Sequence, residues 1–88
     1  MAVVCIRGPL RALADGQGEH ELEGTSVIAL LLALEAAHPG VRGWVLDERG
    51  QIRRHINVFV NGERGAERTP VAPGDRIEVI PAITGGCR

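Results

Sequence analysis

The residues with the clearest chemical potential lie together in the segment Ile83-Thr84-Gly85-Gly86-Cys87-Arg88. Glycine has no Cβ atom, so two adjacent glycines can enter a slot that is too narrow for any side chain. The segment offers too little apolar surface to form a core, and it follows a strongly apolar stretch at residues 76–80. We therefore predict an ordered domain over residues 1–83 and a flexible tail over residues 84–88. A frayed terminus without a function is the alternative explanation.

The rest of the chain contains no recognisable catalytic or metal-binding group. His20, His38 and His55 lack the spacing of metal ligands, and we expect surface histidines at the ends of three separate elements. Cys5 stands beside Arg7 on a predicted strand and is expected to be an inert packing thiol rather than a nucleophile. We therefore expect no catalytic residues, no metal and no bound cofactor.

The amino-acid composition excludes several classes of binding partner. The chain has 88 residues, which is room for one domain, and a net charge of −1 with dispersed arginines, which argues against nucleic-acid binding. It has no apolar run long enough to span a membrane and no signal-peptide start, so we expect a cytoplasmic protein. It has no lysine. It cannot receive an isopeptide bond on a side chain, so in any conjugation it must be the donor.

A helix is predicted over residues 26–37. The hydroxyl of Thr25 or Ser26 can cap its first turn, and the helix should end at His38, before a proline and a glycine. Four apolar residues have the spacing of one buried stripe: Val27, Leu30, Leu31 and Leu34. Ile28 and Leu32 fall outside this stripe. We expect the connection that follows to cover them partly, with a dimer contact as the alternative.

Four strands are predicted. Residues 3–7 and the polar residues 19–23 should form a hairpin, with the polar strand at a sheet edge. Residues 55–60 alternate between apolar and polar side chains and lead into a turn at Asn61-Gly62. Residues 76–80 form the last strand, which should lie beside the first in the centre of the sheet.

The two connecting segments are less regular. Residues 9–18 are rich in turn signals. Residues 41–54 are expected to form a crossover that is attached to the core by Val45 or Leu46, with Trp44 in a structural role.

This element order predicts an α+β protein with the ubiquitin-like β-grasp fold. Its mixed sheet of four to five strands should carry one main helix on one face. On the other face, Phe59 and Ile80 would lie on neighbouring strands, with Cys5 as a further candidate. An exposed apolar patch of this kind often marks a partner surface. An error in the assumed strand register is the alternative.

With this fold in view, three segments resemble the ubiquitin-like sulfur-carrier family typified by the small subunit of molybdopterin synthase and the thiamine sulfur carrier. They are residues 34–41, 55–62 and 73–86, which span the helix exit, the alternating strand and the stretch from Pro73 to the diglycine. The long middle segment is more similar to carriers of cysteine biosynthesis and secondary metabolism than to the shorter thiamine carrier.

The resemblance implies a function for Gly86. An adenylating enzyme of the ubiquitin-activating type would use ATP to activate the Gly86 carboxylate, which is then converted to a thiocarboxylate. Ile83, Thr84 and Gly85 would be recognised in the tail, and Phe59 with Ile80 would form the docking surface. A sulfur-accepting biosynthetic enzyme would take the sulfur. Its product, whether cysteine, molybdopterin, a tRNA base or a secondary metabolite, is not specified by the sequence.

The chain departs from the family pattern after the diglycine. Cys87 and Arg88 follow Gly86, so the carboxylate of Gly86 is held in a peptide bond. Some carriers of the family carry a short extension that a zinc metalloprotease of the JAMM type removes, and we expect the same processing here. Two other functions remain open: a protein modifier that is passed from Gly86 to a lysine of another protein, and a non-catalytic adaptor that uses the open sheet face.

Overall fold

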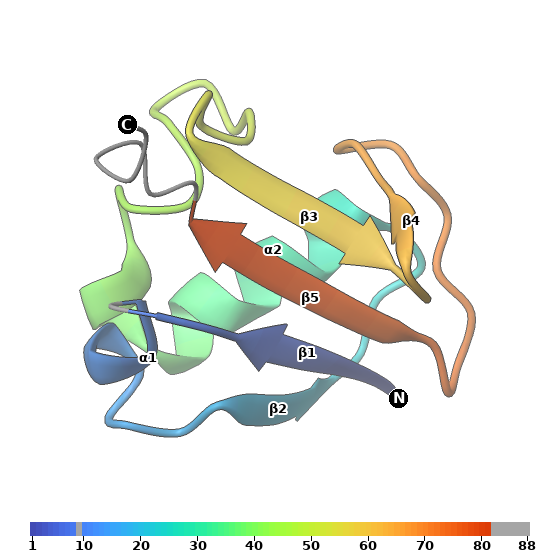
Figure 1. Ribbon diagram of the computed structural model, residues 1–88, viewed down its shortest axis with the longest axis horizontal. Coiled ribbons are helices and arrows are strands. Elements are labelled where there is room, and N and C mark those ends of the chain that lie inside the picture. The colour runs from blue at the N-terminus through green and yellow to red at the C-terminus, as the bar shows by residue number, and fades with distance from the viewer. Residues whose placement is uncertain (9, 82–88) are drawn as a thin grey trace, which may run out of the picture.

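The computed structural model describes residues 1–8 and 10–81, in which a mixed sheet packs one face against a single long helix (Figure 1). The elements in chain order are β1 (Ala2–Ile6), α1 (Leu10–Leu13), β2 (Glu19–Leu22), α2 (Val27–Ala37), the 3-10 helix η1 (Pro39–Val41), β3 (Ile56–Val60), β4 (Glu63–Arg64) and β5 (Arg76–Pro81). The five strands lie in the order β2-β1-β5-β3-β4. The predicted α+β architecture with one main helix is confirmed.

The centre of the sheet is the parallel pair of β1 and β5, as predicted from the apolar character of both strands. Val4 lies opposite Ile77, and all of the inward side chains in this pair are buried. β2 pairs antiparallel with β1 at one edge, and β3 pairs antiparallel with β5 on the other side. β5 therefore has a strand neighbour on each side as far as Val79, and β3 alone pairs with its last two residues.

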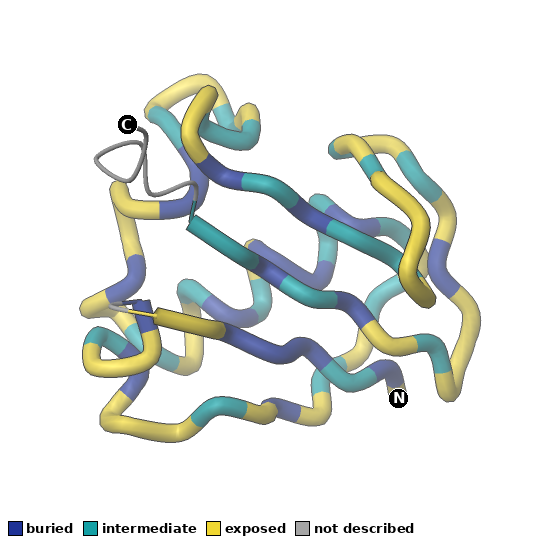
Figure 2. The backbone as a smooth tube through the Cα atoms, in the orientation of Figure 1, coloured by how far each residue is buried: buried dark blue, intermediate teal, exposed yellow. Residues whose placement is uncertain are grey.

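Helix α2 has the predicted position. The Ser26 side-chain oxygen accepts a hydrogen bond from the backbone N–H of Ala29 at 3.3 Å, and His38 caps the other end. The predicted stripe is fully buried, and Figure 2 shows the buried positions of α2 and of the central strands. Burial of each large side chain contributes about 1.5–3 kcal/mol. Ile28 packs against the core as expected, whereas Leu32 remains 50% exposed.

The crossover closes one end of the core. Val45 and Leu46 are both buried, where the sequence predicted one or the other. Leu46 also forms an isolated bridge with Ile52. The structural role predicted for Trp44 is wrong, because its side chain is 54% exposed. Val45 and Leu46 already fill the space at this end of the core, so the indole ring is left at the surface.

Two short elements were not predicted. The turn-rich segment contains α1, and Leu10 within it is buried in the core. A four-residue helix is too short to show a helical period in the sequence. β4 pairs with β3 through the predicted turn, where Asn61 and Gly62 have φ values of 51° and 87°.

Residues 82–88 lie outside the described residues. The predictions for Ile83, Thr84, Gly85, Gly86, Cys87 and Arg88, and for a domain boundary between residues 83 and 84, therefore stay predictions. Within residues 1–8 and 10–81, none of the helices combines the length and the apolar character that a membrane crossing requires.

Candidate functional site

The candidate site begins where β5 ends, at Pro81, which we call the tail root. Pro81 lies opposite Ile56, the first residue of β3. On the other side, the Arg7 backbone N–H donates to the Val79 carbonyl at 3.2 Å. Gly8, with a φ of 67°, leaves room for the proline ring, since a Cβ atom there would lie 3.3 Å from Pro81 Cγ. The tail root is therefore fixed by both neighbouring strands.

The open face of the sheet, opposite α2, carries Phe59 and Ile80. They lie on the neighbouring strands β3 and β5, as predicted, and both are half-buried. Glu78 lies directly opposite Phe59, and Asn57 lies directly opposite Ile80. The two apolar residues are therefore diagonal neighbours within a partly polar surface rather than a continuous apolar patch.

Cys5 does not belong to the accessible part of this face. It is 3% exposed and lies between Glu19 of β2 and Glu78 of β5 in the strand register. Burial raises the pKa of the Cys5 thiol, and the nearby carboxylates add to this effect while Arg76 and Arg7 oppose it. A thiol that stays protonated is a poor nucleophile, which agrees with an inert packing role. Cys5 as a surface contact is a wrong prediction.

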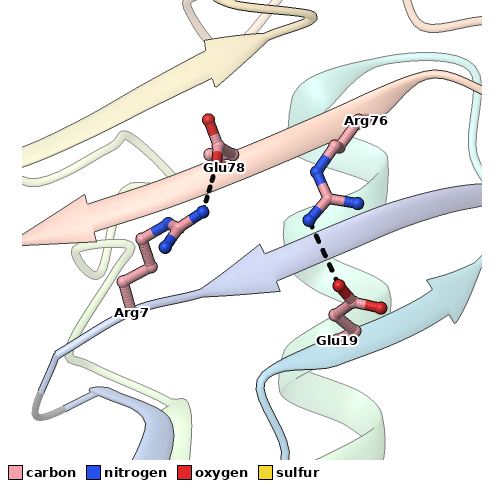
Figure 3. Close-up of polar contacts among 4 residues, drawn as sticks. All are labelled: Arg7, Glu19, Arg76 and Glu78. Carbon is pink, nitrogen blue, oxygen red and sulfur yellow. Dashed lines mark hydrogen bonds and ion pairs between the residues drawn. The ribbon is translucent and has the colours of Figure 1, made fainter.

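Two ion pairs lie across the open face around Cys5 (Figure 3). Arg7 Nη2 donates to Glu78 Oε2 at 2.6 Å, and Arg76 Nη2 donates to Glu19 Oε2 at 3.1 Å. The second pair spans β1, because Arg76 is on β5 and Glu19 is on β2. The hydrogen bond with Glu19 raises the pKa of Arg76, which is charged at any physiological pH. Glu78, opposite Phe59, is thus already paired within the chain, whereas Arg64, opposite Phe59 on β4, forms no ion pair among the described residues.

The histidines are arranged differently from the prediction. His20 is 7% exposed rather than on the surface, and its ring packs edge-on against His38 with the centroids 4.7 Å apart. His38 Nδ1 lies 3.2 Å from Asp15 Oδ2. His55 is exposed, as predicted. The described part of the chain contains no group of three histidine, cysteine or acidic side chains that could hold a metal ion.

A second surface, which was not predicted from the sequence, lies beside the tail root. Gly43, Trp44, Arg53 and His55 line a hollow of about 240 Å³. Arg53 Nε is buried and has no hydrogen-bond partner among the described residues. The one available signal was an isolated tryptophan in a polar stretch, following a glycine whose φ is 85°. Nothing in the sequence distinguishes Arg53 from the other arginines.

Comparison with known proteins places this geometry in context. Residues 4–86 match the profile of the ThiS family. The chain is 31% identical over 83 residues to the sulfur carrier protein CysO of Mycobacterium tuberculosis, covering 88% of this chain and 89% of that protein. It is 34% identical over 67 residues to small archaeal modifier protein 1 of Haloferax volcanii, covering 75% of this chain and 77% of the modifier.

A solved structure gives the same result for the fold. The chain superposes on the crystal structure of the Amycolatopsis orientalis BexX/CysO complex with a TM-score of 0.88 and 30% identity, covering 98% of this chain and 100% of that chain. The five-stranded mixed sheet with one main helix is the β-grasp fold of these neighbours, as predicted.

Proposed function

The chain belongs to the ThiS family, and from this premise we propose that it carries sulfur as a thiocarboxylate on Gly86. The observation that carries the proposal is the extent of the family match, which runs from residue 4 to Gly86 itself. The relatives are carriers and modifiers rather than enzymes, and the chain is likewise a carrier that other enzymes act upon. Its contribution is to present the reacting group.

The proposed chemistry needs two steps at Gly86. A carboxylate is a poor acyl donor, so an adenylating enzyme of the ubiquitin-activating type first joins it to AMP from ATP and releases pyrophosphate. A sulfide-equivalent donor then attacks the acyl carbon, AMP leaves, and the thiocarboxylate forms. Its sulfur is a soft nucleophile for the accepting enzyme. Dependence on ATP places the proposed function in the cytoplasm.

The body of the protein would position the tail. β5 is held by a strand on each side as far as Val79 and by β3 as far as Pro81, so the tail starts from a fixed point. Phe59 and Ile80 lie on the open face close to this point and form the proposed docking surface for the adenylating enzyme. The similar CysO of A. orientalis was solved in complex with BexX, which supports a partner-binding role for this fold.

We also propose that the chain is processed, because Cys87 follows Gly86 and keeps its carbonyl in a peptide bond. A zinc metalloprotease of the JAMM type would add water across the Gly86–Cys87 bond and release the Gly86 carboxylate. Incubation of the full chain with such a protease from the same genome should yield a product that ends at residue 86, as measured by mass spectrometry. An unchanged mass in the presence of active protease would contradict processing.

The adenylation step is tested by comparing two versions of the chain. All helices and strands of the described residues lie between residues 2 and 81, so a chain of residues 1–86 retains them. With the adenylating enzyme of the same genome, we expect residues 1–86 to support ATP–pyrophosphate exchange. Residues 1–88 are the matched control, which should support none without protease. Exchange that is absent with both versions would contradict the proposed function and favour the adaptor.

A protein modifier is the second candidate, favoured by the 34% identity to small archaeal modifier protein 1. In that case the activated Gly86 would be passed to a lysine of another protein, since this chain has no lysine of its own. Mass spectrometry of the proteins that become attached to residues 1–86 in cells separates the two. Isopeptide-linked adducts would favour the modifier, and a free thiocarboxylate without adducts would favour the carrier.

A further inference from the structure

The tail limits how far from the fold an enzyme can act. Gly86 is five residues beyond Pro81, and an extended chain covers at most about 18 Å over five residues. An active site that reaches the Gly86 carbonyl must therefore lie within this distance of the tail root. The entrance of that active site then faces the end of the fold where β5 ends.

This end of the fold carries the hollow formed by Trp44, Arg53 and His55, which we call the tail-root edge. His55 directly precedes Ile56, the strand partner of Pro81, so the edge lies next to the tail root. Figure 1 shows the crossover between α2 and β3 at the same end of the sheet as the tip of β5. Any enzyme that binds the tail comes close to these three side chains.

Trp44 is the feature of this edge that favours a partner. It is the only tryptophan of the chain, and 54% of its surface is exposed although the ring is largely apolar. Val45 and Leu46 complete the core beneath it, so the fold does not use the exposed part of the ring. Tryptophan and arginine are the residues most enriched among those that dominate binding energy in protein interfaces.

Arg53 is the second residue of this edge that favours a partner. Its Nε is buried and lacks a hydrogen-bond partner among the described residues, and no carboxylate lines the hollow that it shares with Trp44. Asp47 and Glu48 line a separate hollow with Arg53, and Asp47 Oδ1 accepts the backbone N–H groups of Arg49 and Gln51 at 2.8 and 3.0 Å, but neither carboxylate forms an ion pair with Arg53 among the described residues. A carboxylate from outside cannot reach the buried Nε, but it can pair with the terminal Nη groups of the same guanidinium, for which the described residues supply no carboxylate partner.

We propose that Trp44, Arg53 and His55 form a second contact surface for the adenylating enzyme, beside the open face. An acidic side chain of that enzyme pairs with Arg53, and apolar surface covers Trp44. The inference rests on the proposed function, which places this enzyme's active site at Gly86. Ile80 and Pro81 are consecutive, so an enzyme seated on Phe59 and Ile80 that also holds the tail must cover the end of β5.

The chain offers a direct spectroscopic test. A ¹⁵N-labelled chain of residues 1–86 has a single indole N–H resonance, because it contains one tryptophan. On addition of the unlabelled adenylating enzyme, we expect this resonance and the Arg53 Nε–H resonance to shift or broaden together with the amides of Phe59 and Ile80. Shifts that are confined to Phe59 and Ile80 would overturn the second surface and leave the proposed function intact.

Two further outcomes would also overturn the proposed second contact surface. If the indole resonance changes with the concentration of the chain alone, a second copy of the chain occupies the edge instead of the enzyme. If residues 1–86 support neither pyrophosphate exchange nor any shift, the proposed function itself has failed and the inference fails with it.

Substitutions measure the strength of the contact. Trp44→Ala in residues 1–86 should raise the KM for the chain in pyrophosphate exchange about tenfold, with kcat unchanged at saturation, as expected for a dominant interface residue. The matched control is Leu32→Ala, because Leu32 is 50% exposed on the outer side of α2 and does not line this hollow. A KM for Trp44→Ala that equals the control would overturn the inference.

Charge reversal tests the acidic partner separately. Arg53→Glu should raise KM at least as much as Trp44→Ala, whereas Arg68→Glu, in the loop after β4, should leave it unchanged. Circular dichroism establishes that both variants fold. Since Arg53 is partly buried, Arg53→Gln, which removes the charge and introduces none, is a second variant that should raise KM by a smaller factor. Unchanged KM values for both Arg53→Glu and Arg53→Gln would exclude the acidic contact.

Discussion

The open face and the tail-root edge lie side by side, yet the charges around Cys5 on the open face are paired within the chain, whereas the polar groups of the edge are not. On the open face, Arg7 is paired with Glu78, Arg76 is paired with Glu19, and the Cys5 thiol is buried beneath them. At the tail-root edge, the ring of Trp44 is exposed and Arg53 Nε is unpaired among the described residues. In the free protein, the ion pairs of the open face are already formed, whereas the tail-root edge has an exposed ring and an unpaired donor.

The difference in charge pairing between the two surfaces determines how each would contribute to binding. A partner gains little from charges that are already paired, so the open face offers shape and the half-buried side chains of Phe59 and Ile80. An exposed aromatic ring and a guanidinium without a carboxylate partner gain more when they are covered. We therefore expect the tail-root edge to add affinity and the open face to set orientation.

The largest effect is expected from a substitution that removes a core side chain beneath both surfaces. Ile77 is fully buried on β5, and Ile77→Ala should lower the free energy of unfolding by about 2–5 kcal/mol. Urea denaturation followed by circular dichroism measures this loss. Ile80→Ala, on the opposite face of the same strand, is the control and should cost clearly less. Equal losses would show that the two faces of β5 are not distinguished by burial.

The next effect concerns the open face alone. Phe59→Asp should raise the KM for residues 1–86 in pyrophosphate exchange about tenfold, because it removes the ring and places a second carboxylate opposite Glu78. Phe59→Ser separates the two causes, since it removes the ring without adding charge. An adenylation rate that is unchanged by Phe59→Asp would show that the docking role of the open face is wrong.

A smaller effect concerns the turns behind each surface. The backbone N–H of Gln51, followed by that of Arg49, holds the pKa of Asp47 below its ordinary value. The backbone N–H of Ala72 does the same for the pKa of Asp75, just before β5, with a further contribution from the Asn61 side chain.

A lowered folded-state pKa determines the direction in which the stability of the fold changes with pH. The stabilising contribution is complete above the unfolded-state pKa of about 4 and is lost as the pH falls through the folded-state pKa. Thermal unfolding between neutral and strongly acidic pH should therefore show less acid sensitivity in Asp47→Asn and Asp75→Asn than in the parent chain. Only Asp47→Asn should also move the Trp44 indole resonance. Unaltered acid sensitivity in both variants would contradict the assignment.

The smallest effect is expected from the ion pairs of the open face. Arg7 is largely exposed, and pairs of this kind contribute little to stability. The double variant Arg7→Gln with Glu78→Gln should leave the thermal unfolding midpoint close to that of the parent chain. A large drop would mean that the paired state of the open face is a major source of stability, against the comparison drawn above.

The regular elements could be predicted from the sequence because each shows a clear period. The helical spacing of Val27, Leu30, Leu31 and Leu34 fixed the buried stripe of α2, and alternation fixed the faces of β3 and β5. The pairing of β1 with β5 followed from their shared apolar character. Phe59 and Ile80 were correctly placed on neighbouring strands for the same reason.

The failures have two physical causes: some elements are too short to show a period, and some side chains depend on packing that only the folded chain defines. α1 is too short to show a period, and the packing of His20 on His38 joins β2 to the end of α2. Trp44 is exposed because Val45 and Leu46 fill the core first. The missing partner of Arg53 Nε is a property of the folded surface and has no counterpart in the sequence.

The most direct measurement is the intact mass of residues 1–86 after incubation with ATP, the adenylating enzyme and sulfide. We expect an acyl-AMP form without sulfide and, with sulfide, a mass increase equal to the replacement of one oxygen by sulfur at Gly86. Failure of both species to form, with an adenylating enzyme that is active in a control reaction, would contradict the central claim.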